Sequence, residues 1–341
     1  MKKLILLFFP FVFLMGSCSE NNDEDNTEPS NCDVVYLSAN GVTVKACDDA
    51  LIGDSGNING FTYTIVSEQQ LRDFVAADYP DLERLVTTQV QDMSNLFIFK
   101  DNFNSYIGNW DVSNVTSMSQ MFWEASSFNQ DINSWDVSKV QDMFGMFHEA
   151  ILFNQPIGDW DVGNVTNMHG LFSRASLFNQ PIGDWDVSNV TNMTALFNDA
   201  SSFNQPLNDW NTEKVTTFFA TFSGAVSFNQ NISSWNFGDS VIMQSMFSSA
   251  LSFNQPLNDW NVSSVSDMSG MFRDADSFNH PLNDWNVSNV TDMIGMFGFN
   301  ASFNQDLSTW DVSSVIDCEQ FSLNTPQWTL PKPNFTNCDP N

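Results

Sequence analysis

The residues with the most obvious capacity for chemistry are carboxylates that flank a recurring tryptophan. Asp or Asn follows each of nine tryptophans, and Asp precedes five of them. Carboxylate oxygens bind Ca²⁺, and the candidate ligands are Asp159, Asp161, Asp184 and Asp186. Hydrogen bonds from turn N–H groups are the other interpretation. The exchange of Asp for Asn favours it, because Asn accepts the same bonds. We therefore expect no cofactor, with bound calcium as the alternative.

The other reactive side chains do not form a catalytic set. The three histidines, His148, His169 and His280, occupy different positions of the repeat described below, and no Ser–His–Asp or Cys–His arrangement is indicated. Abundant carboxylates do not by themselves make a glycosidase, because a catalytic pair needs one acid of raised pKa. We expect no enzymatic activity.

The N-terminus has the pattern of an export signal. Two lysines precede the apolar run 4–15, which is too short to span a bilayer and suits a signal peptide. Gly16 and Ser17 then precede Cys18, an arrangement that resembles a bacterial lipobox. The resemblance implies cleavage before Cys18 and a lipid anchor on its sulfur. An ordinary signal peptide that happens to precede a cysteine is the alternative.

The remaining four cysteines are an even number, as expected of an exported protein. Cys32 and Cys47 lie near one end of the chain, and Cys318 and Cys338 lie near the other. We predict two local disulfides, Cys32–Cys47 and Cys318–Cys338. Free buried thiols are the alternative.

Composition limits the partners. The formal net charge is −30, so the bulk of the protein is not suited to bind nucleic acid or an anionic lipid surface. The chain is 42% hydrophobic and 14% aromatic, which excludes a fully disordered protein. Residues 18–31 are acidic and carry no large apolar side chain, so they predict a flexible tether. Their acidity is similar to the surface-export signal of Bacteroidetes-type lipoproteins, although a plain solvated linker has the same composition.

A 25-residue repeat contains the tryptophans, the carboxylates that flank them and the histidines, so its fold determines where these side chains lie. Two phenylalanine ladders run from Phe97 to Phe297 and from Phe103 to Phe303 in the same period. Unbroken phase predicts one coil per unit, stacked so that neighbouring coils share a core in which the tryptophans are buried. The tryptophans recur once in every unit, at Trp110, Trp135, Trp160, Trp185, Trp210, Trp235, Trp260, Trp285 and Trp310.

Each unit has two halves. The segment 157–162 predicts a short strand, and Val165 to Ala175 has the i, i+3, i+7 spacing of a short helix or 3₁₀ segment. A unit of this length with one strand and one helix falls within the leucine-rich-repeat range, so we predict a leucine-rich-repeat-like solenoid. Short β-helix repeats are the alternative. An asparagine follows the first Phe in every unit and is expected to bond to backbone at a coil corner; the first four are Asn104, Asn129, Asn154 and Asn179.

The consensus Phe-Asn-Gln-Pro-Ile/Leu-x-x-Trp-Asp/Asn-Val-Ser-x-Val-Thr-x-Met-x-x-Met/Leu-Phe-x-x-Ala resembles the BspA-like leucine-rich-repeat surface proteins. The version with a 25-residue unit also occurs in Bacteroidetes and mycoplasma surface lipoproteins. The resemblance covers residues 85–325. It implies a lipid-anchored protein on the outer-membrane cell surface of a Gram-negative bacterium, with adhesion or binding to an extracellular, host or neighbour-cell protein. A glycan-binding or structural surface component, with calcium as a stabiliser, is the alternative function.

The ends of the stack need caps that cover its core. We predict a signal peptide at 1–17, a tether at 18–31 and a small β-rich cap at 32–84. The repeats follow at 85–325, with a partial first coil before nine full units that start at Phe103, and a second cap occupies 326–341. Within the first cap, Asn40-Gly41 predicts a hairpin, and Ser67 with Gln70 predicts a capping box that opens a helix.

Binding is expected where the units differ, since the repeating positions serve packing. The most variable positions follow the Met and Phe of the second half-unit, and they hold Trp123, His148, Arg174, Arg273 and Phe299. Trp123 and Phe299 could be binding anchors. They could also pack on the caps, and the sequence favours that interpretation.

Overall fold

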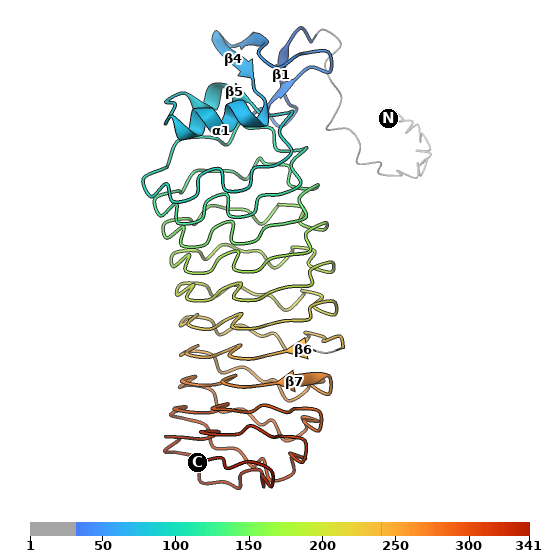
Figure 1. Cartoon of the computed structure of the whole chain (residues 1–341), viewed down its shortest axis with the longest axis vertical. Coiled ribbons are helices and arrows are strands. Elements are labelled where there is room, and N and C mark those ends of the chain that lie inside the picture. The colour runs from blue at the N-terminus through green and yellow to red at the C-terminus, as the bar shows by residue number, and fades with distance from the viewer. Residues whose placement is uncertain (1–31, 240) are drawn as a thin grey trace, which may run out of the picture.

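The protein is an elongated stack of coils with a small cap at its N-terminal end (Figure 1). The computed structural model describes residues 32–239 and 241–341. The predicted signal peptide, Cys18 and the whole of the predicted tether lie outside the described residues. None of the helices in the described part is long and apolar enough to cross a membrane.

The N-terminal cap contains two small sheets. The hairpin expected at Asn40-Gly41 is present and joins β1 to β2 as an antiparallel pair. In the second sheet, β4 pairs antiparallel with β3 and parallel with β5. This sheet therefore continues past the predicted cap boundary at residue 84. The strands are β1 (Val35–Leu37), β2 (Val44–Ala46), β3 (Ser55–Ile58), β4 (Phe61–Ile65) and β5 (Leu85–Val86).

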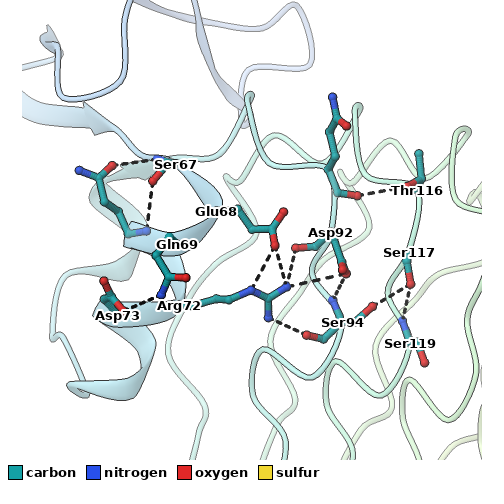
Figure 2. Close-up of polar contacts among 12 residues, drawn as sticks. Ser67, Glu68, Gln69, Arg72, Asp73, Asp92, Ser94, Thr116, Ser117 and Ser119 are labelled. Atoms are coloured by element: carbon teal, nitrogen blue, oxygen red, sulfur yellow. Dashed lines mark hydrogen bonds and ion pairs between the residues drawn. The ribbon is translucent and has the colours of Figure 1, made fainter.

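Helix α1 (Glu68–Ala76) docks the cap on the first coil. The Ser67 side chain and the Gln70 side chain form the expected capping box. In Figure 2 the Arg72 guanidinium reaches across to the coil, where it donates to the backbone oxygens of Ser94 (2.8 Å) and Asp92 (3.0 Å). The same group pairs with Glu68 one turn earlier. The short 3₁₀ helix η2 (Leu82–Arg84) then leads into β5.

Successive coils form one parallel β-bridge per coil, in addition to other backbone hydrogen bonds between coils. Ser117 bridges Asp92 on one side and Asp142 on the other, and the same register continues to Asp317. Within residues 32–239 and 241–341, two coils extend this contact into named strands, β6 (Val241–Ile242) and β7 (Val265–Asp267), which pair in parallel. Each coil therefore lies directly above its neighbour, and the paired residues are one repeat apart in sequence.

The prediction of one strand and one helix per coil is wrong. Residues 157–162, expected as a strand, form an irregular turn in which the Trp160 N–H donates to the Ile157 oxygen. The expected helix is a run of β-turns, and no coil in the described ranges contains a named helix. In one coil the N–H groups of Met121 and Trp123 each donate to the carbonyl oxygen three residues earlier in the chain. The N–H group of Phe122 instead donates to the carbonyl oxygen of Met146 in the next coil. A run of turns and a helix both bring every third residue to one face, so the apolar spacing cannot distinguish them.

The aromatic ladders fill the core. The nine repeat tryptophans are at most 5% exposed. Each indole N–H also donates to a backbone oxygen of the preceding coil, as from Trp185 to Ile157 at 3.0 Å. The phenylalanine rings stack along the whole axis, with centroids 5.8 Å apart between Phe147 and Phe172 and 3.9 Å apart between Phe172 and Phe178. Offset stacking of this kind adds about 0.5–1.5 kcal/mol per pair beyond area burial.

The asparagine ladder bonds to backbone at the coil corner. The Asn104 side-chain oxygen accepts the N–H of Asn129 at 2.9 Å, and the Asn129 oxygen accepts that of Asn154 at 3.0 Å. The pattern continues to Asn304, which accepts the N–H of Thr329. The role of this ladder is therefore structural.

Both ends of the stack are covalently fastened. The structure contains the disulfides Cys32–Cys47, within the cap, and Cys318–Cys338, across the last coil. At the C-terminal end the Trp328 ring lies edge-on to Phe303 with centroids 4.7 Å apart, which covers the last phenylalanine of the ladder.

The turns place two residues per coil in the left-handed region, and glycine occupies only some of these positions. Ala195 has φ 51°, whereas Gly170 and Gly270 occupy the equivalent position in other coils. We expect Ala195→Gly to raise the melting temperature, because removing Cβ at positive φ is worth about 0.5–1 kcal/mol. Buried Ala200, which lacks this conformation, is the matched control. There Ala→Gly should lower the melting temperature, and equal effects at the two sites would contradict the turn assignment.

Candidate binding face

One lateral face of the stack carries the side chains that vary most. We call it the turn face. It consists of three positions per coil, of which the third is at positive φ in every coil from Glu124 to Phe299. In the first full coil these positions are Ser119, Trp123 and Glu124, and the same three positions recur in each later coil. Because these positions lie outside the core ladders, they can vary without disturbing the stack.

An aromatic patch occupies the N-terminal half of the turn face. The rings of Trp123 and His148 stack with centroids 3.8 Å apart, and Phe144 is tilted against Trp123 at 5.9 Å. His169 meets Phe144 edge-on at 4.9 Å. At Gly145 an added Cβ would lie 2.6 Å from the Trp123 ring, so the indole lies directly over this glycine. The patch thus joins rings from three successive coils.

Both histidines of the patch favour the neutral form. Burial lowers the pKa of His148 against the opposing influence of Glu149. Burial also lowers the pKa of His169. Two neutral imidazoles packed on apolar rings make an uncharged, partly buried surface. At the edge of this surface the His148 Nε2 atom lies 3.8 Å from the Glu149 carboxylate.

Charged side chains surround the patch. The Trp123 indole N–H donates to the Glu124 carboxylate at 3.0 Å. Arg174 pairs with Glu149 in one adjoining coil and lies 3.7 Å from Asp199 in the other. The hydrogen bond from Arg174 to Glu149 raises the pKa of Arg174, so the guanidinium stays charged. An apolar centre with a polar rim is the usual anatomy of a protein interface.

The remaining predicted site residues lie farther along the same face. The Arg273 guanidinium sits 4.7 Å from the centre of the Phe299 ring and 3.6 Å from the Asp274 carboxylate. The expectation that Trp123 and Phe299 pack on the caps is wrong. The Trp123 ring contacts His148 in the next coil, and the Phe299 ring contacts Arg273 in the preceding coil, both on the turn face. Phe144 and His169 were not among the predicted binding residues, although both replace the Ser or Thr that several other coils carry at this position.

The four predicted calcium ligands are exposed and are not brought together as a metal site. Asp161 accepts the backbone N–H of Gly163, and Asp186 accepts that of Ser188, each at 3.0 Å. Hydrogen bonds from Ser188 lower the pKa of Asp186. Asp159 and Asp184 are likewise exposed. Within residues 32–239 and 241–341, no group of three or more His, Cys, Asp or Glu side chains is placed to hold a metal ion.

A separate set of stacked carboxylates lies at the position where the coils pair. Asp292 bridges Asp267 in one neighbouring coil and Asp317 in the other. Burial, together with these two carboxylates, raises the pKa of Asp292, while the hydrogen bond from the Ile294 N–H acts in the opposite direction. Asp142, by contrast, bridges Ser117 and Asn167, which carry no charge.

The stacked coils with one variable face define a repeat protein. A model of the family described as "Mycoplasma protein of unknown function, DUF285" matches residues 68–176, 153–256 and 240–329, which together span most of the chain. The chain therefore belongs to this family. Comparison with curated proteins and with solved structures gave no match.

The carboxylate stack predicts an acid-dependent stability. Asp292→Asn should stabilise the protein at neutral pH by up to about 1 kcal/mol, because like charges directly opposite each other destabilise a pair of strands. Since the folded-state pKa of Asp292 is raised, its stabilising contribution is present at low pH and is lost as the pH rises through that pKa. The gain in melting temperature should therefore vanish in acid. Asp142→Asn is the matched control, and an equal gain there would contradict the interpretation.

Proposed function

We propose that this protein is a lipid-anchored bacterial surface protein whose turn face binds an extracellular protein. In this proposal the coils form a solenoid related to the BspA-like leucine-rich-repeat surface proteins. Cys18 carries the lipid, and residues 18–31 separate the stack from the outer membrane of a Gram-negative cell. Adhesion to a host or neighbouring cell is the corresponding role.

The aromatic patch on the turn face is the observation that supports binding. Trp123, Phe144 and His148 are partly exposed in a chain whose other repeat aromatics are mostly buried. Tryptophan and tyrosine dominate the binding energy of protein interfaces when they lie at a centre ringed by polar groups. Glu124, Glu149 and Arg174 supply such a ring here, as described above.

Lipid anchoring is tested at Cys18. In a bacterial host that processes lipoproteins, Cys18→Ala should move the protein from the membrane fraction to the soluble fraction, because the acyl chains supply the membrane affinity. Metabolic labelling with a fatty acid checks the same point directly. Cys32→Ala is the control and should leave the fractionation unchanged. Retention of the Cys18→Ala variant in the membrane would contradict lipidation at this residue.

Partner binding is tested at Trp123. The purified protein is screened against immobilised extracellular matrix and cell-surface proteins, and the partner that binds is then measured with variants. Trp123→Ala should weaken binding by about 2 kcal/mol if this side chain is a central anchor. Ile316→Ala removes an exposed apolar side chain from outside the turn face and should have no effect. Equal affinity of the Trp123→Ala variant and the parent would exclude the patch as the binding site.

A further inference from the structure

The N-terminal cap meets the first full coil in a cleft that is separate from the turn face. It encloses about 440 Å³, and Phe61, Tyr63, Glu83, Arg84, Tyr106 and Asn109 are among its lining residues. We call it the cap cleft. Its volume falls within the range of about 300–1,000 Å³ that is typical of sites for small ligands. We propose that the cap cleft binds a neutral saccharide.

Two aromatic rings of the cleft are strongly exposed. Phe61 is 52% exposed and Tyr106 is 44% exposed, whereas the phenylalanines of the core ladders are buried apart from Phe103, which is partly buried. Apolar surface gathered in a concavity marks a ligand-binding groove in many proteins. The C–H face of a pyranose ring is a natural cover for a flat aromatic ring, because it is apolar and carries a weak positive potential against the negative ring face.

Tyr106 departs from the residue types of the repeat at this position. The equivalent position holds Pro, Asp or Asn in the other eight units, and all four tyrosines of the protein lie between residues 36 and 106. The ring lies against Gly108, where an added Cβ would be 2.8 Å from the Tyr106 Cε2 atom. One side of the ring therefore rests on the backbone at Gly108, which restricts its movement and lowers the entropic cost of binding.

The charged groups of the cleft compensate each other. The Arg84 guanidinium lies 4.1 Å from the centre of the Phe61 ring and donates to the Tyr63 hydroxyl at 3.0 Å. Its Nε atom is 3.9 Å from the Glu83 carboxylate. Because Arg84 is already paired and the whole chain carries a net charge of −30, an anionic ligand is disfavoured. The cleft thus suits a neutral ligand rich in hydrogen-bonding groups.

Asn109 provides a second, independent indication of a polar ligand. Its Nδ2 donates to the backbone oxygen of Glu83 at 2.7 Å, and the residue is 7% exposed. Its Oδ1 finds no hydrogen-bond partner among the described residues. A buried acceptor without a donor is costly. The Oδ1 atom is closed to solvent, so a sugar hydroxyl would reach it once the Asn109 side chain, which lines the cleft, turns toward the ligand. Sugar hydroxyls can donate to Asn109 and accept from Arg84 while the ring stacks on Tyr106.

The proposal is tested by titrating the purified full chain with neutral oligosaccharides. The probes are cello-, malto-, xylo- and manno-oligosaccharides and chito-oligosaccharides, with binding measured by calorimetry. Tyr106→Ala should weaken binding of the responding probe by about tenfold, whereas Tyr106→Phe keeps the ring and should retain most of the affinity. Phe219→Ala removes an exposed ring from the turn face and should leave saccharide binding unchanged. Melting curves of each variant establish that it is folded.

The possible outcomes are distinct. Saccharide binding that depends on Tyr106 and not on Phe219 supports the proposal. Binding that is unaffected by Tyr106→Ala, or the failure of every neutral probe to bind, overturns it. A peptide probe whose binding depends on Tyr106 would also overturn it and make the cleft a peptide site. None of these results depends on lipidation at Cys18 or on Trp123, so the proposed surface function is tested separately.

Discussion

Backbone hydrogen bonds between coils are the constraint on which the rest of this structure depends. In the run of turns, alternate N–H groups donate within their own coil, and those between them donate to the next coil, as Phe122 does to Met146. One inserted residue would misalign these bonds and leave buried polar groups unpaired, which is costly. The 25-residue period therefore continues without interruption, and the indole and asparagine ladders add side-chain bonds in the same register.

This constraint also decides where recognition can occur. The repeated aromatic, Met, Val and Asn positions are committed to the core or to the adjoining coil, so changes there would weaken the stack. The turn face and the junction with the cap are free of that requirement. Trp123 departs from the repeat on the turn face, where it contacts Phe144. Tyr106 departs from it at the junction with the cap, where its ring lies against Gly108. The negative charge is spread along the stack, with Asp267, Asp292 and Asp317 brought into line by the pairing of coils.

Several elements were predictable from sequence because a local signal specifies them. The Ser67–Gln70 capping box and the Asn40-Gly41 hairpin depend on bonds between near neighbours, and both are present. Strand β3 has no such local signal, because Ser55–Ile58 has little β propensity and is held by its pairing with β4. The prediction of a helix in each coil was wrong for a different reason. Turns and helices share the i, i+3 spacing, and the choice between them depends on carbonyl groups of the next coil, such as that of Met146 for Phe122.

The sequence by itself determined the repeat, its period, the residues of the core ladders and the cysteines available for pairing. These follow from residue type and spacing, which set what can be buried and what lies in register. Only the tertiary structure decided the backbone path of each coil and the grouping of its outer side chains. Trp123, Phe144, His148 and His169 come from three coils, and Phe61 and Tyr106 come from the cap and the first coil. The stacking of coils and the docking of the cap determine which side chains become neighbours, because these contacts join residues that are far apart in the sequence.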